Sequence, residues 1–151
     1  MKELLEYRVK MMARLEEAAR EFVAACKTRD AFAAVAGSEW NIHQLAFHAR
    51  DVDKFVYGER IQKTLHEDNP GFKEFDVDAW TSAHYDKDEA LEKILDEFLK
   101  NITRLCDSLR ALPREAWSRE SSHETFGDRL TLQLWVERSV AHIEEHLKTL
   151  K

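Results

Sequence analysis

A chain of 151 residues has the length of one domain and can bury a full hydrophobic core without disulfides. With 44% hydrophobic and 34% charged residues but only four glycines and two prolines, the composition is typical of a mostly helical protein. The net charge of −6 argues against nucleic acid and anionic membrane as partners, because both are bound through a basic surface.

The N-terminal segment and the cysteines indicate the cellular compartment in which the protein is expected. The first ten residues, MKELLEYRVK, mix charged residues with leucines and contain no uninterrupted apolar stretch. They resemble neither a signal peptide nor a membrane span, so we expect a cytoplasmic protein. Cys26 and Cys106 fall on or near apolar helix stripes, which predicts two reduced cysteines in the core.

The first half of the chain predicts two amphipathic helices. From about residue 2 to residue 27, apolar side chains recur at helical spacing. Asn41 with Gln44 resembles a capping box, which indicates that a second helix begins there and runs to about His66. The turn sequence at residues 69–71, NPG, ends that helix.

The second half predicts two more helices. One is expected to begin near Asp86, with Glu89 completing a second capping box, and to end before Pro113. Residues 114–129 are expected to hold only a short turn and a bend. Thr131 is then expected to cap the last helix, which runs to the end of the chain.

Four long helices and no strand pattern predict an all-α four-helix bundle, a single domain over residues 1–151. Residues 71–85 are irregular and aromatic, so we expect an ordered crossover that packs on the bundle. A crossover of about twenty residues can span the bundle length, which lets the second and third helices run parallel. The predicted topology is therefore up, down, down, up.

Three histidines are placed so that this topology brings them together. His48 lies about seven residues into the second helix, and His142 and His146 lie a comparable distance from the end of the fourth. These two helices run antiparallel, so the three imidazoles share one level. The four-residue spacing of His142 and His146 puts both on one face. Three neutral imidazoles suit zinc, nickel, iron or cobalt and leave coordination positions open, as catalytic metal sites do.

The same residues have a simpler interpretation. A pair four residues apart arises by chance in a chain with seven histidines. His142 and His146 lie on the flank of an apolar stripe, where a half-buried histidine can form an ordinary hydrogen bond. Asp51, one turn after His48 on the same face, is the candidate general base, or it orients the His48 ring from behind. A surface aspartate is the alternative.

Several short motifs resemble, in order and spacing, those of one known family. The motifs are Trp40-Asn41-Ile42 followed by His48 and Asp51, the segments 75–80 (FDVDAW) and 112–117 (LPREAW), Phe126-Gly127, Leu130-Thr131-Leu132, and His142 with His146. With these motifs the chain resembles the DinB-like superfamily over nearly its whole length. The resemblance implies an up-down-down-up four-helix bundle whose three histidines bind zinc, nickel or a similar divalent ion. Carried over residue by residue, the metal ligands would be His48, His142 and His146.

The resemblance also implies a class of activity. Family members with an assigned activity look like metal-dependent hydrolases, or thiol S-transferases and isomerases that use bacillithiol, mycothiol or glutathione. A small-molecule substrate, with a low-molecular-weight thiol as one candidate, and a homodimer are therefore implied. Many relatives have a histidine directly before the last ligand, whereas this chain has Glu145, on the solvent side of the helical wheel. Arg50, Arg60 and Arg138 could assemble a basic pocket for an anionic thiol.

Two classes of function stay open. The first is a metal-dependent enzyme with Asp51 as base or orienter and an apolar pocket between the helices. The second is a non-catalytic bundle that binds a small ligand or dimerises, with a vestigial metal site. An accessible cavity beside the histidines favours the first, and a site packed shut by Trp135 and Phe55 favours the second.

The remaining histidines are expected to be peripheral. His43 is predicted to point away from His48, toward solvent or an interface. His84 and His123 fall at helix ends or in loops, from which they could line the mouth of the pocket.

Overall fold

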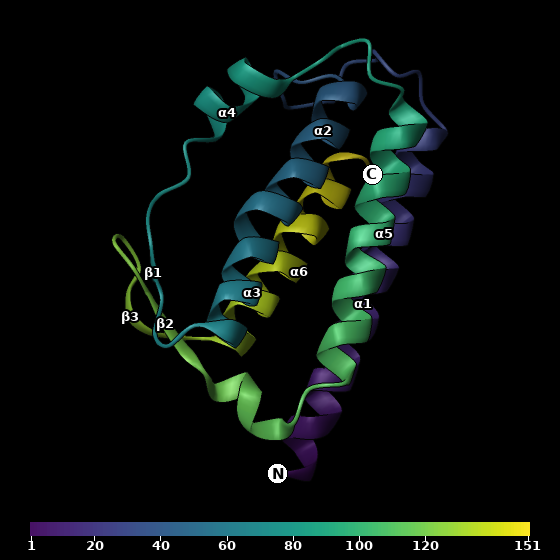
Figure 1. The fold of residues 1–151 in the computed structure, drawn as a ribbon. Helices are drawn as coiled ribbons and strands as arrows, with labels where there is room; N and C mark the ends of the chain where they lie inside the picture. Colours follow the sequence, from purple (N-terminus) through teal and green to yellow (C-terminus); the bar gives the residue numbers. More distant parts are fainter.

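Four long helical segments form the bundle in a computed structural model that describes residues 1–151 (Figure 1). The second segment is one continuous helix in three parts, because a π-helical turn, η1, joins α2 to α3. Their bounds are α1 Lys2–Lys27, α2 Ile42–Val52, η1 Asp53–Gly58, α3 Glu59–His66, α5 Leu91–Arg110 and α6 Leu132–Thr149.

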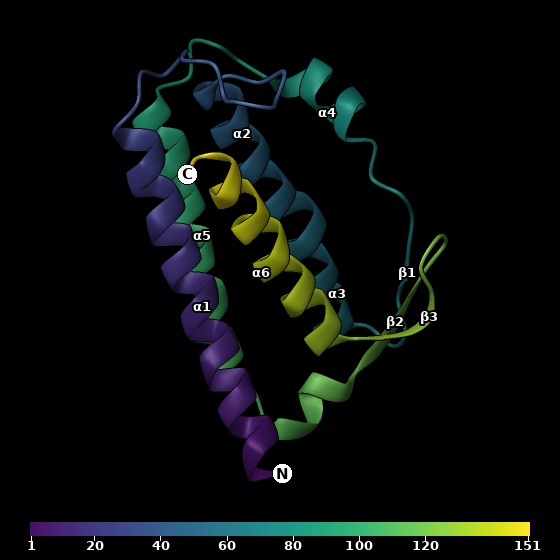
Figure 2. The same ribbon diagram turned by 180° about the vertical axis from the view of Figure 1, so that it is seen from behind.

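The helices run up, down, down, up, as predicted. Figure 1 shows α1 rising from the N-terminus, α2 with α3 descending, α5 descending, and α6 rising to the C-terminus. The reverse view shows α1 beside α5 on one side, with α6 in front of α2 and α3 (Figure 2). Helix α1 packs on α5 and α6, α2 packs on α5, and α3 packs on α6. The start of α2 therefore lies at the same end of the bundle as the end of α6.

The helix ends test the predicted caps. Asn41 and Gln44 form both hydrogen bonds of a capping box, and the Thr131 side chain caps α6, so both predictions are confirmed. The predicted start of the third helix is wrong, because α5 begins at Leu91. The Glu89 carboxylate, which the box would need, instead accepts hydrogen bonds from the Arg50 guanidinium at 2.6 and 3.0 Å.

A small three-stranded sheet was not predicted from the sequence. It consists of β1 Gly71–Phe72, β2 Glu120–His123 and β3 Gly127–Thr131, with β1 parallel and β3 antiparallel to β2. The strands are short and largely polar, so no alternation of apolar and polar residues marks them. In both views the sheet lies beside the end of the bundle where α3 ends and α6 begins (Figures 1 and 2).

The crossover between α3 and α5 is ordered, as expected. It contains β1 and the helix α4, Val77–His84, whose N-terminus is capped by the side chain of Asp76. Trp80 and Tyr85 pack against the hydrophobic core. Between the sheet and α4 the chain runs along the outer side of the α2–α3 segment (Figure 1).

The core is contributed by all four long helices, and it includes both cysteines. Cys26 and Cys106 are fully buried free thiols, and burial raises the pKa of each to about 12, which confirms them as inert core residues. None of the helices combines the length and the apolar character that crossing a bilayer requires.

The π-turn η1 places a carboxylate in the core. Asp53, its first residue, is 4% exposed, and its Oδ1 accepts a hydrogen bond of 3.5 Å from the hydroxyl of Ser139 on α6. At the other end of the turn, a Cβ on Gly58 would lie 2.8 Å from the Asp53 carbonyl oxygen. A residue without a side chain is therefore required at position 58. Burial raises the pKa of Asp53 to about 7, partly offset by the Ser139 hydrogen bond.

Asp53 is expected to destabilise the fold increasingly as pH rises. The carboxyl titrates near 3.8 in an ordinary setting and near 7 in the fold, so between these values the native state holds a proton that the unfolded chain has lost. The contribution of Asp53 to the free energy of unfolding should therefore decline as pH rises through this window and level off above it. Asp53→Asn lacks this contribution, so the stability of wild type relative to the variant should fall over the window, and the variant should be the more stable by a few kcal/mol near pH 8. Urea unfolding of both proteins at several pH values measures this difference. If the free energies of unfolding of wild type and Asp53→Asn changed in parallel with pH, the prediction would be contradicted.

Candidate metal centre

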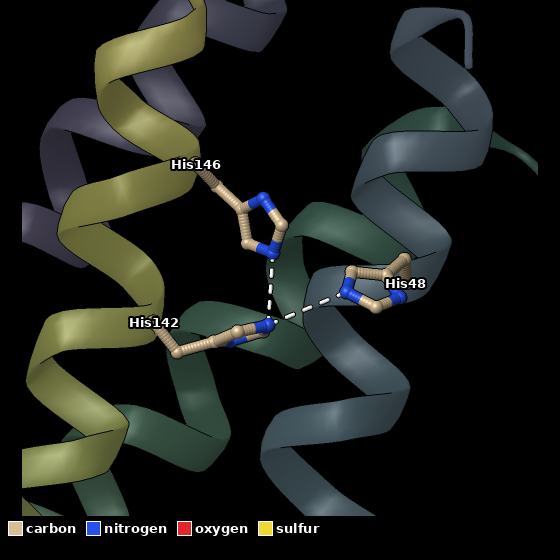
Figure 3. Close-up of side chains that lie close together, drawn as sticks. All are labelled: His48, His142 and His146. Carbon is tan, nitrogen blue, oxygen red and sulfur yellow. Dashed lines mark hydrogen bonds between the residues drawn. The ribbon is translucent and has the colours of Figure 1, made fainter. Parts of the chain in front are cut away.

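The three predicted histidines meet between α2 and α6. His48 comes from α2, and His142 and His146 come from successive turns of α6 (Figure 3). The Nε2 atom of His142 lies 3.3 Å from Nε2 of His48 and 2.8 Å from Nε2 of His146. One nitrogen from each ring therefore points at a common centre, and the ligand atoms all lie within 4.8 Å of one another.

Trp40 holds the first of these rings. Its indole packs on His48 with the ring centroids 4.4 Å apart, and its centroid lies 6.5 Å from that of His146. The Nδ1 atom of His48 is buried and has no hydrogen-bond partner. Packing against the indole, rather than a hydrogen bond at Nδ1, therefore sets the orientation of the His48 ring. The tryptophan eight residues before the first histidine thus has a direct structural role at the site.

The environment keeps the three rings neutral. Burial is the largest cause of the lowered pKa at each of them, and the pKa falls to about 4 for His48 and about 3 for His142. The neighbouring His146 lowers the pKa of both other rings further. At neutral pH the nitrogens therefore offer unprotonated lone pairs, which a cation needs.

The donor set fits a divalent ion. Four-coordinate zinc binds imidazole nitrogen at about 2.0–2.1 Å, which places ligand nitrogens roughly 3.3 Å apart in a tetrahedron. The Nε2 atoms of His142 and His48 already have this separation, at 3.3 Å. None of these three Nε2 atoms has a hydrogen-bond partner outside the cluster. Three imidazoles and no carboxylate leave the charge of a bound cation uncompensated, with coordination positions open to water or substrate.

Two of the three histidines lie in the wall of a cavity of about 210 Å³. His48 and His142 form part of its wall, together with Val52 and Val56 on the same helix as His48. The crossover contributes Phe75 and Val77, the hairpin of β2 and β3 contributes Phe126, and the remaining lining residues are Tyr57, Arg60, Glu74 and Arg138. The wall of the cavity is therefore partly apolar and partly charged.

Asp51 does not point into this cavity. One carboxylate oxygen accepts a hydrogen bond from Arg50 Nε at 2.8 Å, and the other accepts one from Trp80 Nε1 at 2.8 Å. Both contacts lie on the side of α2 that faces α4, where Asp51 lines a different pocket. Its position therefore ties α4 to α2, and no hydrogen bond links it to a histidine of the cluster.

His43 is not exposed, in contrast to the expectation. Its ring is 1% exposed, with Nδ1 2.7 Å from the Tyr85 hydroxyl and Nε2 2.6 Å from the Glu89 carbonyl oxygen. A carbonyl can only accept, so Nε2 carries the proton and Nδ1 accepts from Tyr85. The ordered crossover covers this face of α2, which the helical wheel could not show. His43 is nevertheless no part of the cluster.

The other two histidines occupy different surroundings. His84 stacks on Trp80 with centroids 3.8 Å apart, beside the pocket that Asp51 lines. His123 is buried in the small sheet, where its Nδ1 accepts hydrogen bonds from the backbone N–H groups of Thr125 and Phe126. Glu145 is exposed, as the helical wheel predicted.

The sequence suggested that Arg50, Arg60 and Arg138 could assemble one basic pocket. The structure brings Arg60 and Arg138 into the wall of the histidine cavity, whereas Arg50 is paired with carboxylates elsewhere. A signal for Arg138 exists in the sequence, because it lies four residues before His142 and so shares its helix face. Arg60 has no such signal, because η1 intervenes between it and His48.

A solved structure resembles this fold over almost its whole length. It is YfiT from Bacillus subtilis, described as a probable metal-dependent hydrolase with an unusual four-helix bundle topology. The two structures match with a TM-score of 0.84 at 21% sequence identity, over 96% of this chain and 84% of the YfiT chain. At this level of identity the likeness establishes a shared fold. No curated protein sequence matches this chain.

The family itself follows from the sequence match. A family model described as the DinB superfamily matches residues 1–150, which is all but the last residue of the chain. The resemblance that the short motifs indicated is thereby confirmed. With its up-down-down-up bundle and its cluster of three histidines, the chain belongs to the DinB superfamily.

Proposed function

We propose that this protein is an enzyme that uses a divalent metal ion, zinc or nickel in the first place and iron as a further candidate, bound by His48, His142 and His146. The reaction class we propose is hydrolysis, or transfer to a low-molecular-weight thiol. The observation that carries the proposal is the convergence of three neutral Nε2 atoms beside a cavity. When bound there, such an ion would supply a Lewis acid that makes a nucleophile from water or a thiol near neutral pH.

The chain's own residues would hold and shield the reacting group. The two α6 histidines and His48 would fix a site between α6 and the continuous α2–η1–α3 helix, and Trp40 keeps the His48 ring in place. Apolar side chains from α2, η1 and the crossover line the cavity and limit the access of water. A small molecule is therefore the substrate that the site can accommodate.

The accessible cavity favours an enzyme over a non-catalytic bundle. A site packed shut by Trp135 and Phe55 would have favoured the non-catalytic bundle. Instead, Trp135 is buried against the sheet, where it donates a hydrogen bond to Ser121, and Phe55 packs on Trp80 with centroids 4.6 Å apart. Neither residue lines the cavity beside the histidines.

Asp51 remains our prediction for a supporting carboxylate, and its contacts favour a positioning role. As a general base it would have to reach the cavity, and so give up its hydrogen bonds to Arg50 and Trp80. While both bonds are kept, Asp51 instead anchors α4 and thereby the crossover, whose Phe75 and Val77 form one wall of the cavity.

Metal content is the first test of this proposal. Purified, untagged wild-type protein should contain near-stoichiometric zinc, nickel or iron, and His146→Ala should contain almost none, because two imidazoles bind far more weakly than three. Elemental analysis of both proteins at high concentration provides the measurement. Loss of metal in the variant would justify screening ester, amide and thiol-transfer substrates. Absence of metal from both proteins, even after reconstitution, would favour the non-catalytic bundle.

A further inference from the structure

Two arginines in the wall of the histidine cavity lack the partners that buried arginines normally have. Arg60 on α3 and Arg138 on α6 line the same 210 Å³ cavity as His48 and His142. Neither of them forms an ion pair, although the chain has 29 acidic residues and a net charge of −6. Glu74 lines the same cavity but forms no ion pair with either guanidinium.

Arg60 forms no ion pair within the protein. It is only 8% exposed, and its one contact at hydrogen-bond distance is with Nε2 of His123, at 3.3 Å. Nδ1 of His123 accepts two backbone hydrogen bonds, so the proton of the neutral ring must be on Nε2. Two donors therefore face each other, and this contact satisfies neither group. Burying a cation without an acceptor is costly, which indicates that its partner is a bound ligand.

Arg138 is in a similar position. It is half-buried, and its Nε is buried without any hydrogen-bond partner. Its guanidinium lies over the ring of Phe126 at 4.4 Å, while that of Arg60 lies over Trp135 at 4.9 Å. Packing on an aromatic face fixes a guanidinium and leaves the N–H groups at its edge free to bind an oxyanion.

Arg50 shows what a buried arginine looks like when the protein itself supplies the anion. Its guanidinium forms ion pairs with Asp51 at 2.8 Å, Glu89 at 2.6 Å and Glu97 at 3.3 Å. Three carboxylates thus surround one cation in the pocket beside α4. The two cavity arginines have none at ion-pair distance. Burial lowers the pKa of Arg60, the nearby Tyr57 and Glu74 partly offset this, and the positive charge of Arg138 lowers the pKa further.

We propose that Arg60 and Arg138 form an oxyanion-binding subsite that holds a carboxylate or phosphate group of the substrate beside the three histidines. This inference rests on the proposed function, because it assigns the substrate to the same cavity. The substrate would be a small molecule with its reacting bond or thiol at the histidine end and an anionic group at the arginine end. An anion there supplies the acceptors that both guanidiniums lack.

Binding of inorganic phosphate to the purified protein tests the subsite. We expect Arg138→Gln and Arg60→Gln each to weaken phosphate binding roughly tenfold or more, because a charge-assisted, bidentate contact is lost. Arg104→Gln is the matched control, since Arg104 is exposed and also has no ion pair, and it should bind phosphate as wild type does. Isothermal titration calorimetry measures the affinity, and competition by acetate shows whether carboxylates are accepted as well.

Metal content of the same samples separates the two proposals. Unchanged metal together with weakened phosphate binding in both arginine variants would support the subsite. Equal phosphate affinity in Arg138→Gln and wild type, or no binding of phosphate or acetate by wild type, would overturn it while leaving the metal site intact. If wild type contains no metal and phosphate binding still depends on the arginines, the subsite stands and the proposed enzyme does not. Because Arg60 is buried, circular dichroism must show that its variant is folded, and the half-buried Arg138 provides the second test.

Discussion

Replacing His142 with alanine is expected to abolish tight metal binding while the bundle stays folded. Its Nε2 is the one that lies within 3.3 Å of both other ligand nitrogens, so its loss leaves two imidazoles with an unfilled position between them. The affinity should fall by far more than the roughly 10- to 100-fold that loss of an outer partner costs. His48→Ala should behave in the same way. Zinc titration with a competing chelator measures the affinity, and circular dichroism follows the fold.

His43→Ala is the matched control for these variants. Its ring is buried in the same helix as His48 but contacts Tyr85 and Glu89 instead of the cluster. Metal affinity should therefore equal that of wild type, whereas stability should fall by about 1–3 kcal/mol because two polar partners lose their hydrogen bonds. Unchanged metal content in both His142→Ala and His48→Ala would overturn the assignment of the ligands.

Replacing Trp135 with alanine should cause the largest loss of stability, about 3–5 kcal/mol. The indole is fully buried where α6 meets the small sheet, and its Nε1 donates a 2.8 Å hydrogen bond to the Ser121 hydroxyl, which donates in turn to the Leu130 carbonyl oxygen. The variant would lose both the packing of a large ring and the bond that joins α6 to β2. Denaturant unfolding measures the change in the free energy of unfolding.

Trp135→Phe separates the two contributions. This variant keeps an aromatic ring under the Arg60 guanidinium but removes the N–H donor. Its free energy of unfolding should therefore fall clearly less than that of Trp135→Ala. A loss below about 1 kcal/mol in Trp135→Ala would show that the sheet is not held through this residue.

The sequence alone was sufficient to predict the long helices, the topology of the bundle and the cluster of three histidines. These features depend on local signals, namely apolar stripes at helical spacing, the Asn41 and Thr131 caps, and the length of the crossover. The shared position of the three histidines along the bundle axis follows from the lengths and directions of the helices alone. The ligand set could therefore be placed before any side-chain contact was known.

Features that depend on contacts between distant segments could not be predicted in this way. Strand β2 pairs with β1 about fifty residues earlier, and neither has an apolar alternation that would mark it. The start of α5 was misplaced because Glu89 bonds to Arg50 on α2 instead of to its own helix. The burial of His43 depends on the crossover that covers it, and the contacts of Asp51 depend on Trp80 from the same segment.

The π-turn η1 also determines which side chains share the cavity. An α-helix turns by about 100° per residue, so in a regular helix Arg60, twelve residues after His48, would point about 120° away from it. Each i→i+5 bond encloses one residue more than an α-helical bond, so the turn acts as a one-residue insertion and leaves Arg60 only about 20° from the direction of His48. Deletion of one residue within Asp53–Gly58 would convert the turn into regular α-helix with Arg60 still about 20° from the direction of His48, so the cavity should keep its arginine. Closing the π-turn to α-helical bonds without a deletion would instead rotate α3 by about 100° and separate the arginine from the metal ligand, with neither residue altered.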